Sequence, residues 1–163
     1  MTTACVVLAL TACSTFTIPL DVAPPQITGV DGRSSELRIL SPSTDRPVGG
    51  AAVRLWSRIE NPNAFGLSIT TIAGDLFLGD GGALRVDFPL GLPLAAQSDT
   101  VVPLDVSVGF EDLPALGTSL VAAALEGALE YRLEATIGVD AGMLGQPTFG
   151  PLTALSGTLR VSR

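Results

Sequence analysis

Residues 53–67 read Val53-Arg54-Leu55-Trp56-Ser57-Arg58-Ile59-Glu60-Asn61-Pro62-Asn63-Ala64-Phe65-Gly66-Leu67, and this stretch decides the fold of the chain. Its first half alternates between apolar and polar side chains. Val53, Leu55 and Ile59 share one face, and the other face carries Arg54, Trp56, Arg58 and Glu60. A period of two is typical of a half-buried β-strand, so we expect a strand that ends near residue 60.

The strand is expected to end at a corner formed by Asn61, Pro62 and Asn63. Pro62 has no N–H to donate to a neighbouring strand, and it disfavours helical backbone angles at Asn61. Asn63 suits a corner because asparagine tolerates a positive φ or closes an Asx-turn with its own backbone. The two asparagines would also suit a ligand site, but formation of the corner is the favoured interpretation.

The rest of the chain repeats the alternating pattern between turn signals, which indicates an antiparallel all-β sandwich in one domain. Residues 79–82 predict a hairpin turn, residues 91–99 a connector, and Ala73-Gly74 a bulge. The strands are predicted at residues 26–30, 36–40, 67–72, 74–78, 84–90, 100–110, 129–139 and 155–161.

One segment departs from this pattern. Residues 112–125 carry apolar side chains near helical spacing, with Asp112 placed to cap a helix and Pro114 in its first turn. We therefore expect one short helix over residues 112–125, covering an open end of the sandwich.

Composition excludes several classes of function. The 163 residues carry a net charge of −7, and all nine basic residues are arginine. An acidic surface repels nucleic acid and gains no attraction from anionic lipids. The chain has no histidine or lysine, so Ser-His-Asp, Cys-His and Schiff-base chemistry are excluded. We expect no catalytic residues, no cofactor and no metal site, and hence no enzyme.

Two acidic groupings have simpler explanations than a functional site. Asp75 and Asp80-Gly81-Gly82 lack the ligand spacing of a calcium loop, so a plain hairpin is favoured. Glu130 and Glu134 share a strand face around Arg132, which indicates a surface charge ladder rather than a pair of catalytic carboxylates.

The N-terminal residues predict a lipid anchor. Residues 5–12 form an apolar run too short to span a bilayer, and Leu10-Thr11-Ala12-Cys13 resembles a lipobox. This divides the chain into a signal peptide (1–12), a tether (13–25) lipidated at Cys13, and the sandwich (26–163). Ser14 favours the outer membrane, facing the periplasm, by analogy with such lipoproteins. The leader lacks the usual basic residues, and an incidental apolar N-terminus is the alternative.

Together these elements resemble a known family. The alternation into Asn61-Pro62-Asn63, the following Phe65-Gly66-Leu67, the run at residues 99–106, the expected helix and the closing strand come in a shared order. Over about residues 36–162 this order is similar to the water-stress-and-hypersensitive-response (WHy) domain of late-embryogenesis-abundant (LEA) type 2 proteins. Bacterial members with a lipobox leader have a similar layout.

The resemblance implies an immunoglobulin- or fibronectin-III-like antiparallel β-sandwich of about seven to eight strands with one short helix. It also implies a role in desiccation or stress tolerance, without enzymatic activity or a fixed cofactor. The acidic surface and the long Gly/Pro connectors depart from the family's usual pattern.

Two functions follow as hypotheses. The first is a lipid-anchored, monomeric protectant of protein clients or membranes. The second is an adaptor lipoprotein that docks an envelope partner through a sheet edge or through Trp56, Arg54 and Arg58. Trp56 lies between the two arginines, where it would stack on them or pack under a loop or the helix, and both arrangements stay open.

Overall fold

The computed structural model describes residues 21–79, 82–110 and 127–162. These residues form eight β-strands and one short 3-10 turn, η1 (Gly142–Leu144). The strands are β1 (Gln26–Gly29), β2 (Glu36–Leu40), β3 (Gly50–Glu60), β4 (Leu67–Leu78), β5 (Ala83–Leu94), β6 (Asp99–Gly109), β7 (Ala128–Asp140) and β8 (Thr148–Ser162).

Strand β3 organises the sheet. It pairs along its whole length with β6, while β1 and β2 share its other side: β1 lies against its last residues and β2 against its first. The sheet continues from β2 through a parallel pairing with β8 and then through β7 and β4 to β5. Every other pairing is antiparallel.

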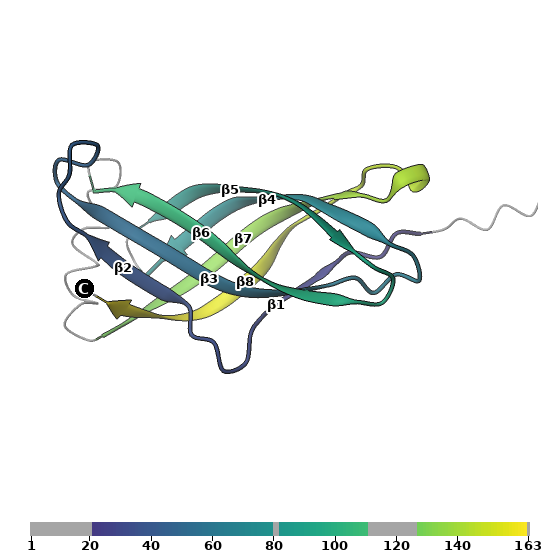
Figure 1. Cartoon of the computed structure of the whole chain (residues 1–163), viewed down its shortest axis with the longest axis horizontal. Coiled ribbons are helices and arrows are strands. Elements are labelled where there is room, and N and C mark those ends of the chain that lie inside the picture. Colours follow the sequence, from purple (N-terminus) through teal and green to yellow (C-terminus); the bar gives the residue numbers. More distant parts are fainter. Residues whose placement is uncertain (1–20, 80–81, 111–126, 163) are drawn as a thin grey trace, which may run out of the picture.

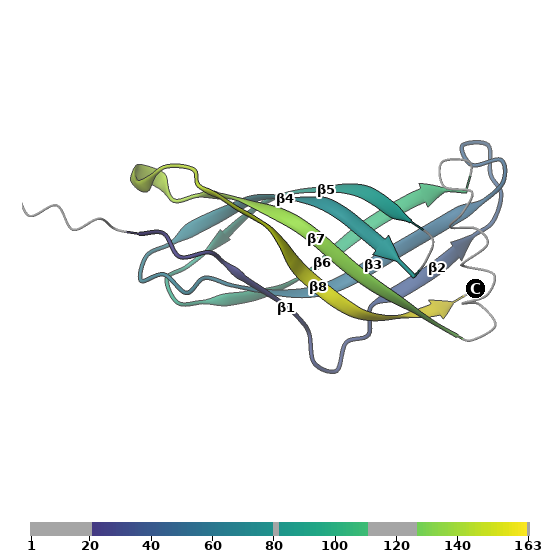
Figure 2. The same cartoon turned by 180° about the vertical axis from the view of Figure 1, so that it is seen from behind.

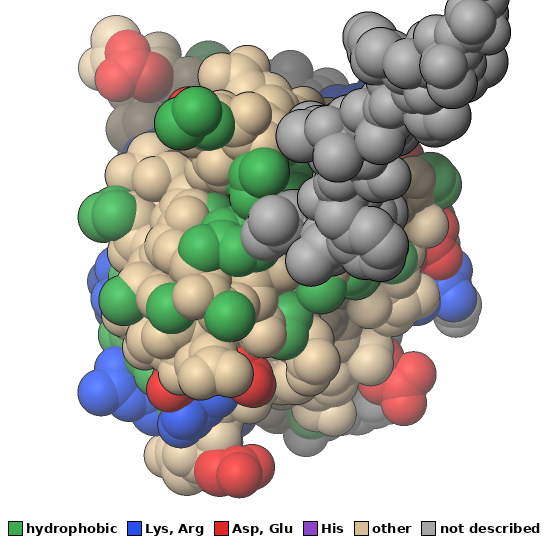
Figure 3. All heavy atoms as spheres, turned by 90° about the vertical axis from the view of Figure 1, so that its right-hand side faces the viewer, with side chains coloured by type: hydrophobic (Ala, Val, Ile, Leu, Met, Phe, Trp, Pro, Cys, Tyr) green, Lys and Arg blue, Asp and Glu red, His purple; other side chains and the backbone are tan. Residues whose placement is uncertain are grey.

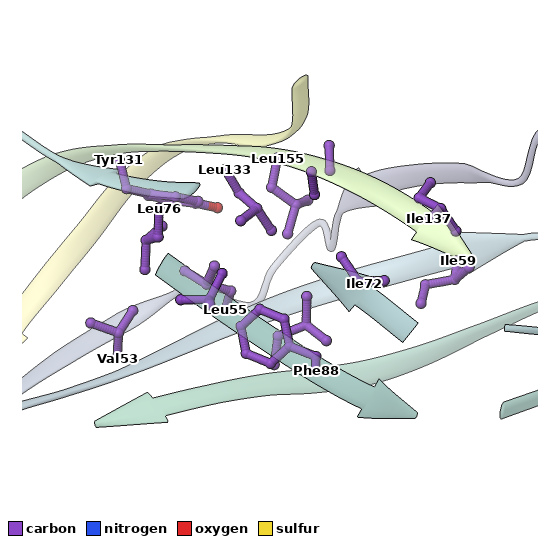
Figure 4. Close-up of a cluster of buried hydrophobic side chains, with 14 of the residues drawn as sticks. Val53, Leu55, Ile59, Ile72, Leu76, Phe88, Tyr131, Leu133, Ile137 and Leu155 are labelled. Carbon is purple, nitrogen blue, oxygen red and sulfur yellow. The ribbon is translucent and has the colours of Figure 1, made fainter. Parts of the chain in front are cut away.

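The sheet folds over on itself into two layers. Figures 1 and 2 show β6, β3 and β2 on one side of the molecule and β5, β4 and β7 on the other. The core fills the space between them, where Leu55 and Ile59 of β3 approach Ile72 of β4 and Leu133 and Ile137 of β7 (Figure 4). The prediction of an all-β sandwich is confirmed.

The alternation along β3 is the physical reason for this arrangement. Val53, Leu55 and Ile59 are at most 2% exposed, whereas Arg54 and Arg58 on the opposite face are exposed. One face of the strand is therefore removed from water, and the other carries its charges where solvent screens them.

Two strands are longer than their sequence patterns indicated. β5 runs on to Leu94 through the expected connector, because Pro93 is tolerated on an edge strand that pairs only with β4. β8 begins at Thr148, well before residue 155, and its pairing with β7 is interrupted by two register shifts. Such shifts break the alternation by which a strand is detected.

The expected bulge lies elsewhere. The register of β4 shifts between Ile69 and Thr71, while Gly74 pairs regularly with Ala135 of β7. A Cβ on Gly74 would overlap the backbone around Glu134 and Ala135, so this glycine permits close approach of two strands. The prediction of a bulge at Ala73-Gly74 was wrong in position.

The predicted helix at residues 112–125 lies outside the described residues, as do the leader, Cys13 and half of the hairpin turn at residues 79–82.

Candidate functional site

The corner after β3 is built on two buried amides. The Asn61 side chain is 0% exposed, and its Nδ2 donates to the backbone oxygens of Phe65 and Ala95, both at 2.8 Å. Its Oδ1 accepts from the backbone N–H and from Nδ2 of Asn63, both at 3.0 Å. The Asn61 amide therefore makes four hydrogen bonds.

Asn63 extends this network to the segment before β1. Its Nδ2 donates to the backbone oxygen of Ala23 and its Oδ1 accepts from the Ala23 N–H, both at 2.9 Å. The backbone adds two further links, since Asn61 N donates to Ser98 O at 2.8 Å and Gln97 N donates to Asn63 O at 3.0 Å. Three segments far apart in the sequence thus meet at the corner.

This geometry supports the structural interpretation of the two asparagines. All four of their side-chain N–H groups donate within the protein, so none is left to donate to a ligand. The chain turns between β3 and β4 around these residues, and the hydrogen bonds there differ from the ones expected. Asn61, not Asn63, closes the Asx-turn, and the positive-φ non-glycine residue in the described part is Gln97 (φ 51°) in the β5–β6 turn.

Trp56 lies half-buried on the outer face of β3. The guanidinium carbon of Arg33 lies 4.4 Å from the ring centroid and that of Arg54 lies 5.9 Å from it. Ser35 Oγ accepts from the Trp56 backbone N–H at 3.2 Å, so the β1–β2 loop runs beside this residue. Trp56 therefore both stacks on arginine and lies beside a loop. Arg33 has no periodic signal in the sequence that would have predicted this contact.

The two neighbouring arginines pair with carboxylates of β6. Arg54 makes a bidentate ion pair with Asp105 at 2.7 and 2.8 Å, and Arg58 Nη1 contacts Asp99 Oδ2 at 2.6 Å. The hydrogen bonds that Arg54 donates to Asp105 lower the pKa of Asp105 and raise the pKa of Arg54. Both partners of each pair are about half exposed, so solvent weakens their attraction.

A shallow hollow of about 300 Å³ lies beside these pairs on the outer face of β2, β3 and β6. Charged side chains of both signs line it, including Glu36, Arg38, Arg54 and Asp105. Arg54 and Asp105 bind each other at its edge.

One carboxylate of each acidic grouping lies in an ion pair on the surface. Asp75 is 3.2 Å from Arg85 across the β4–β5 pair, and Glu134 is 3.2 Å from Arg132, whose guanidinium also lies over Phe77. Within residues 21–79, 82–110 and 127–162, no cluster of three or more His, Cys, Asp or Glu side chains is suited to hold a metal ion. The same residues include no helix long and apolar enough to cross a membrane.

A family model described as "Late embryogenesis abundant protein" (LEA_2) matches residues 57–152. No curated protein matches the sequence. Among solved structures, the solution structure of AT1g01470 from Arabidopsis thaliana aligns with a TM-score of 0.57 at 16% identity, covering 88% of this chain and 86% of that one. This likeness shows the fold.

Two further solved structures align less well. One is a solution structure described as a late embryogenesis abundant (LEA) protein, At2g46140.1 (TM-score 0.46, 16% identity, covering 78% of this chain and 71% of that one). The other is a crystal structure of a protein from Archaeoglobus fulgidus (TM-score 0.44, 10% identity, covering 80% and 98%).

Proposed function

We propose that this chain, which belongs to the late embryogenesis abundant protein family (LEA_2), is a non-catalytic envelope protein that protects proteins or membranes during desiccation or related stress. The observation that carries the proposal is the family match over residues 57–152. The WHy type of domain within that family is part of the proposal and is supported by the order of motifs around Asn61-Pro62-Asn63.

The absence of catalysis is inferred from the chemistry of the side chains. The chain has no histidine or lysine, and the buried amides at the corner are occupied by backbone partners. The exposed arginines of β3 are held by Asp99 and Asp105. Protection of other molecules requires only a stable, soluble protein surface. A net charge of −7 favours solubility.

The proposal includes a lipid anchor on Cys13, on the periplasmic side of the outer membrane. It is supported by the lipobox-like Leu10-Thr11-Ala12-Cys13. Acyl chains would hold the protein at the membrane by burial of apolar surface. We expect Cys13→Ala to release the protein from membranes in a density gradient. Flotation of the variant with membranes, processed as the parent is, would refute the anchor.

The protective activity is tested separately from the anchor. Full-length Cys13→Ala protein is dried with a labile enzyme and rehydrated, with albumin at equal mass as the control. We expect more recovered enzyme activity than with albumin, and the same β-type circular dichroism spectrum before and after drying. Recovery no better than with albumin would count against protection.

The second candidate function is an adaptor that docks an envelope partner. Prolines on two of the edge strands, Pro89 and Pro93 of β5 and Pro103 of β6, disfavour addition of a partner strand there. The outer face of β3 around Trp56 and Arg33 is then the favoured docking surface. A partner recovered at stoichiometry from detergent-solubilised membranes, and lost with Trp56→Ala, would support this function over protection.

A further inference from the structure

One end of the sandwich, the corner end, carries few charged residues in its loops. Four segments meet there: residues 21–25, 61–66, 95–98 and 141–147. Within these segments Asp21 is the single ionisable residue, while Glu60, Asp99 and Asp140 border them at the ends of β3, β6 and β7. Figure 3 looks onto this end and shows apolar side chains scattered among polar ones and backbone, with charged side chains toward the rim. Exposed apolar side chains at this end of a protein of net charge −7 call for a physical explanation.

The most exposed apolar side chains of this end lie on the β7–β8 connection. Met143 is 104% exposed and Leu144 is 40% exposed. Their backbone is well fixed, because Asp140 accepts from the Gly142 N–H at 2.8 Å and Ala141 donates to Gly145 O at 2.9 Å. The loop therefore holds a fully exposed methionine. Its 3-10 turn η1 lies at one end of the molecule, drawn as the short coil in Figure 1.

The opposite end provides a contrast. There the β2–β3 loop, residues 41–49, carries Val48 at 58% exposure next to Asp45 and Arg46. Val48, Met143 and Leu144 are the exposed large apolar residues of the described part of the chain. Two of the three are thus at the corner end, whose loops carry few charges.

The chain that precedes the domain arrives at the corner end. Residues 21–25 enter β1 from this side in both views (Figures 1 and 2), and Ala23 is fastened to Asn63. Ten peptide units separate Cys13 from Ala23, and a fully extended chain of that length spans at most about 35 Å. A lipid on Cys13 would therefore keep this end close to the membrane.

We propose that the corner end docks on the lipid surface, with Met143 and Leu144 entering the interface between headgroups and acyl chains. The proposal rests on the proposed envelope attachment and adds to it a fixed orientation: the strands stand away from the membrane, and the opposite end faces outward. The occupant is a zwitterionic bilayer, because the attraction is apolar and the net charge is negative.

The test uses the full chain with Cys13→Ala, so that no acyl chain contributes. Binding to phosphatidylcholine vesicles is measured by co-sedimentation for this protein and for two further variants made in it, Met143→Glu and Val48→Glu. Both add one negative charge at an exposed apolar residue, one at each end of the sandwich. Any contribution of residues 1–20 is common to all three proteins.

We expect Met143→Glu to weaken vesicle binding about 10-fold and Val48→Glu to leave it within about twofold, since burial of one such side chain is worth about a factor of ten. Binding by the Cys13→Ala parent should change little between low and high salt. Equal effects of the two substitutions, or no effect of either, would overturn the proposal. Self-association lost with Met143→Glu, without vesicle binding by the parent, would identify a second copy as the occupant instead. None of these results bears on lipidation of Cys13, which the density gradient decides.

Discussion

The two polar groupings associated with β3 differ in what surrounds them. At its end, Asn61 and Asn63 are at most 6% exposed and bind neutral backbone groups. On its outer face, Arg54 and Arg58 are about half exposed and bind carboxylates. Formal charge would rank the ion pairs as the stronger interactions. Burial reverses the ranking, because a buried group that loses its partner stays without water, while an exposed one is resolvated.

The largest effect is expected from Asn61→Leu. This substitution removes four hydrogen bonds and leaves the Phe65 and Ala95 oxygens and the Asn63 amide without their partner. We expect a loss of roughly 3–5 kcal/mol in the free energy of unfolding, measured by urea denaturation. Asn61→Asp is the matched control for shape: it keeps the acceptor for Asn63 but loses both donors, and should also destabilise. A loss below about 1 kcal/mol would show that water replaces the amide.

Asn63 should follow with a smaller effect. Asn63→Ala removes both hydrogen bonds to Ala23 and one to Asn61, which predicts a loss of about 1–3 kcal/mol. Asn63→Val should cost about the same as Asn63→Ala, because the φ of Asn63 is not positive.

Asn63→Gly separates the two explanations of this residue. If a positive φ were the reason for asparagine, glycine would retain most of the stability. Since hydrogen bonding is the reason, glycine should be at least as destabilising as alanine in the same denaturation experiment. Retained stability in the glycine variant would contradict the hydrogen-bonding account.

The smallest effect is expected from the ion pair. Asp105→Asn should lower the melting temperature by less than about 3 °C at neutral pH and moderate salt. The pKa of Asp105 is lowered in the folded state, so its contribution is present above its ordinary value of 3.8 and is lost as the pH falls below that value. The parent and the variant should therefore converge in stability at low pH and at high salt. A difference that persists at low pH would exclude Asp105 as its source.

The sequence predicted what depends on local spacing. Alternation located β3 and β7, and the Asn-Pro-Asn triplet located the corner. The partners of the corner were beyond prediction, because Ala95 lies 34 residues from Asn61 and Ala23 lies 40 residues from Asn63. The contact of Arg33 with Trp56 was missed for the same reason, since Arg33 lies in the β1–β2 loop and Trp56 in β3. The partner of Ser57 is also remote in the sequence. This polar residue is 0% exposed on the core face of β3, and its Oγ donates to Val102 O at 3.0 Å.

The fastening of Ala23 to Asn63 has a mechanical consequence. Strand β1 has only four residues and pairs with the end of β3, so a pull on the preceding chain would open it one pair at a time. The two hydrogen bonds at Ala23 lie ahead of β1 on the path of any such force. They pass the load to the corner, where the β5–β6 turn shares it through Ala95, Gln97 and Ser98. If the domain is held by its N-terminal side, a pulling force on that side would thus be carried by the corner and the β5–β6 turn. Strand β1 would then stay paired with β3.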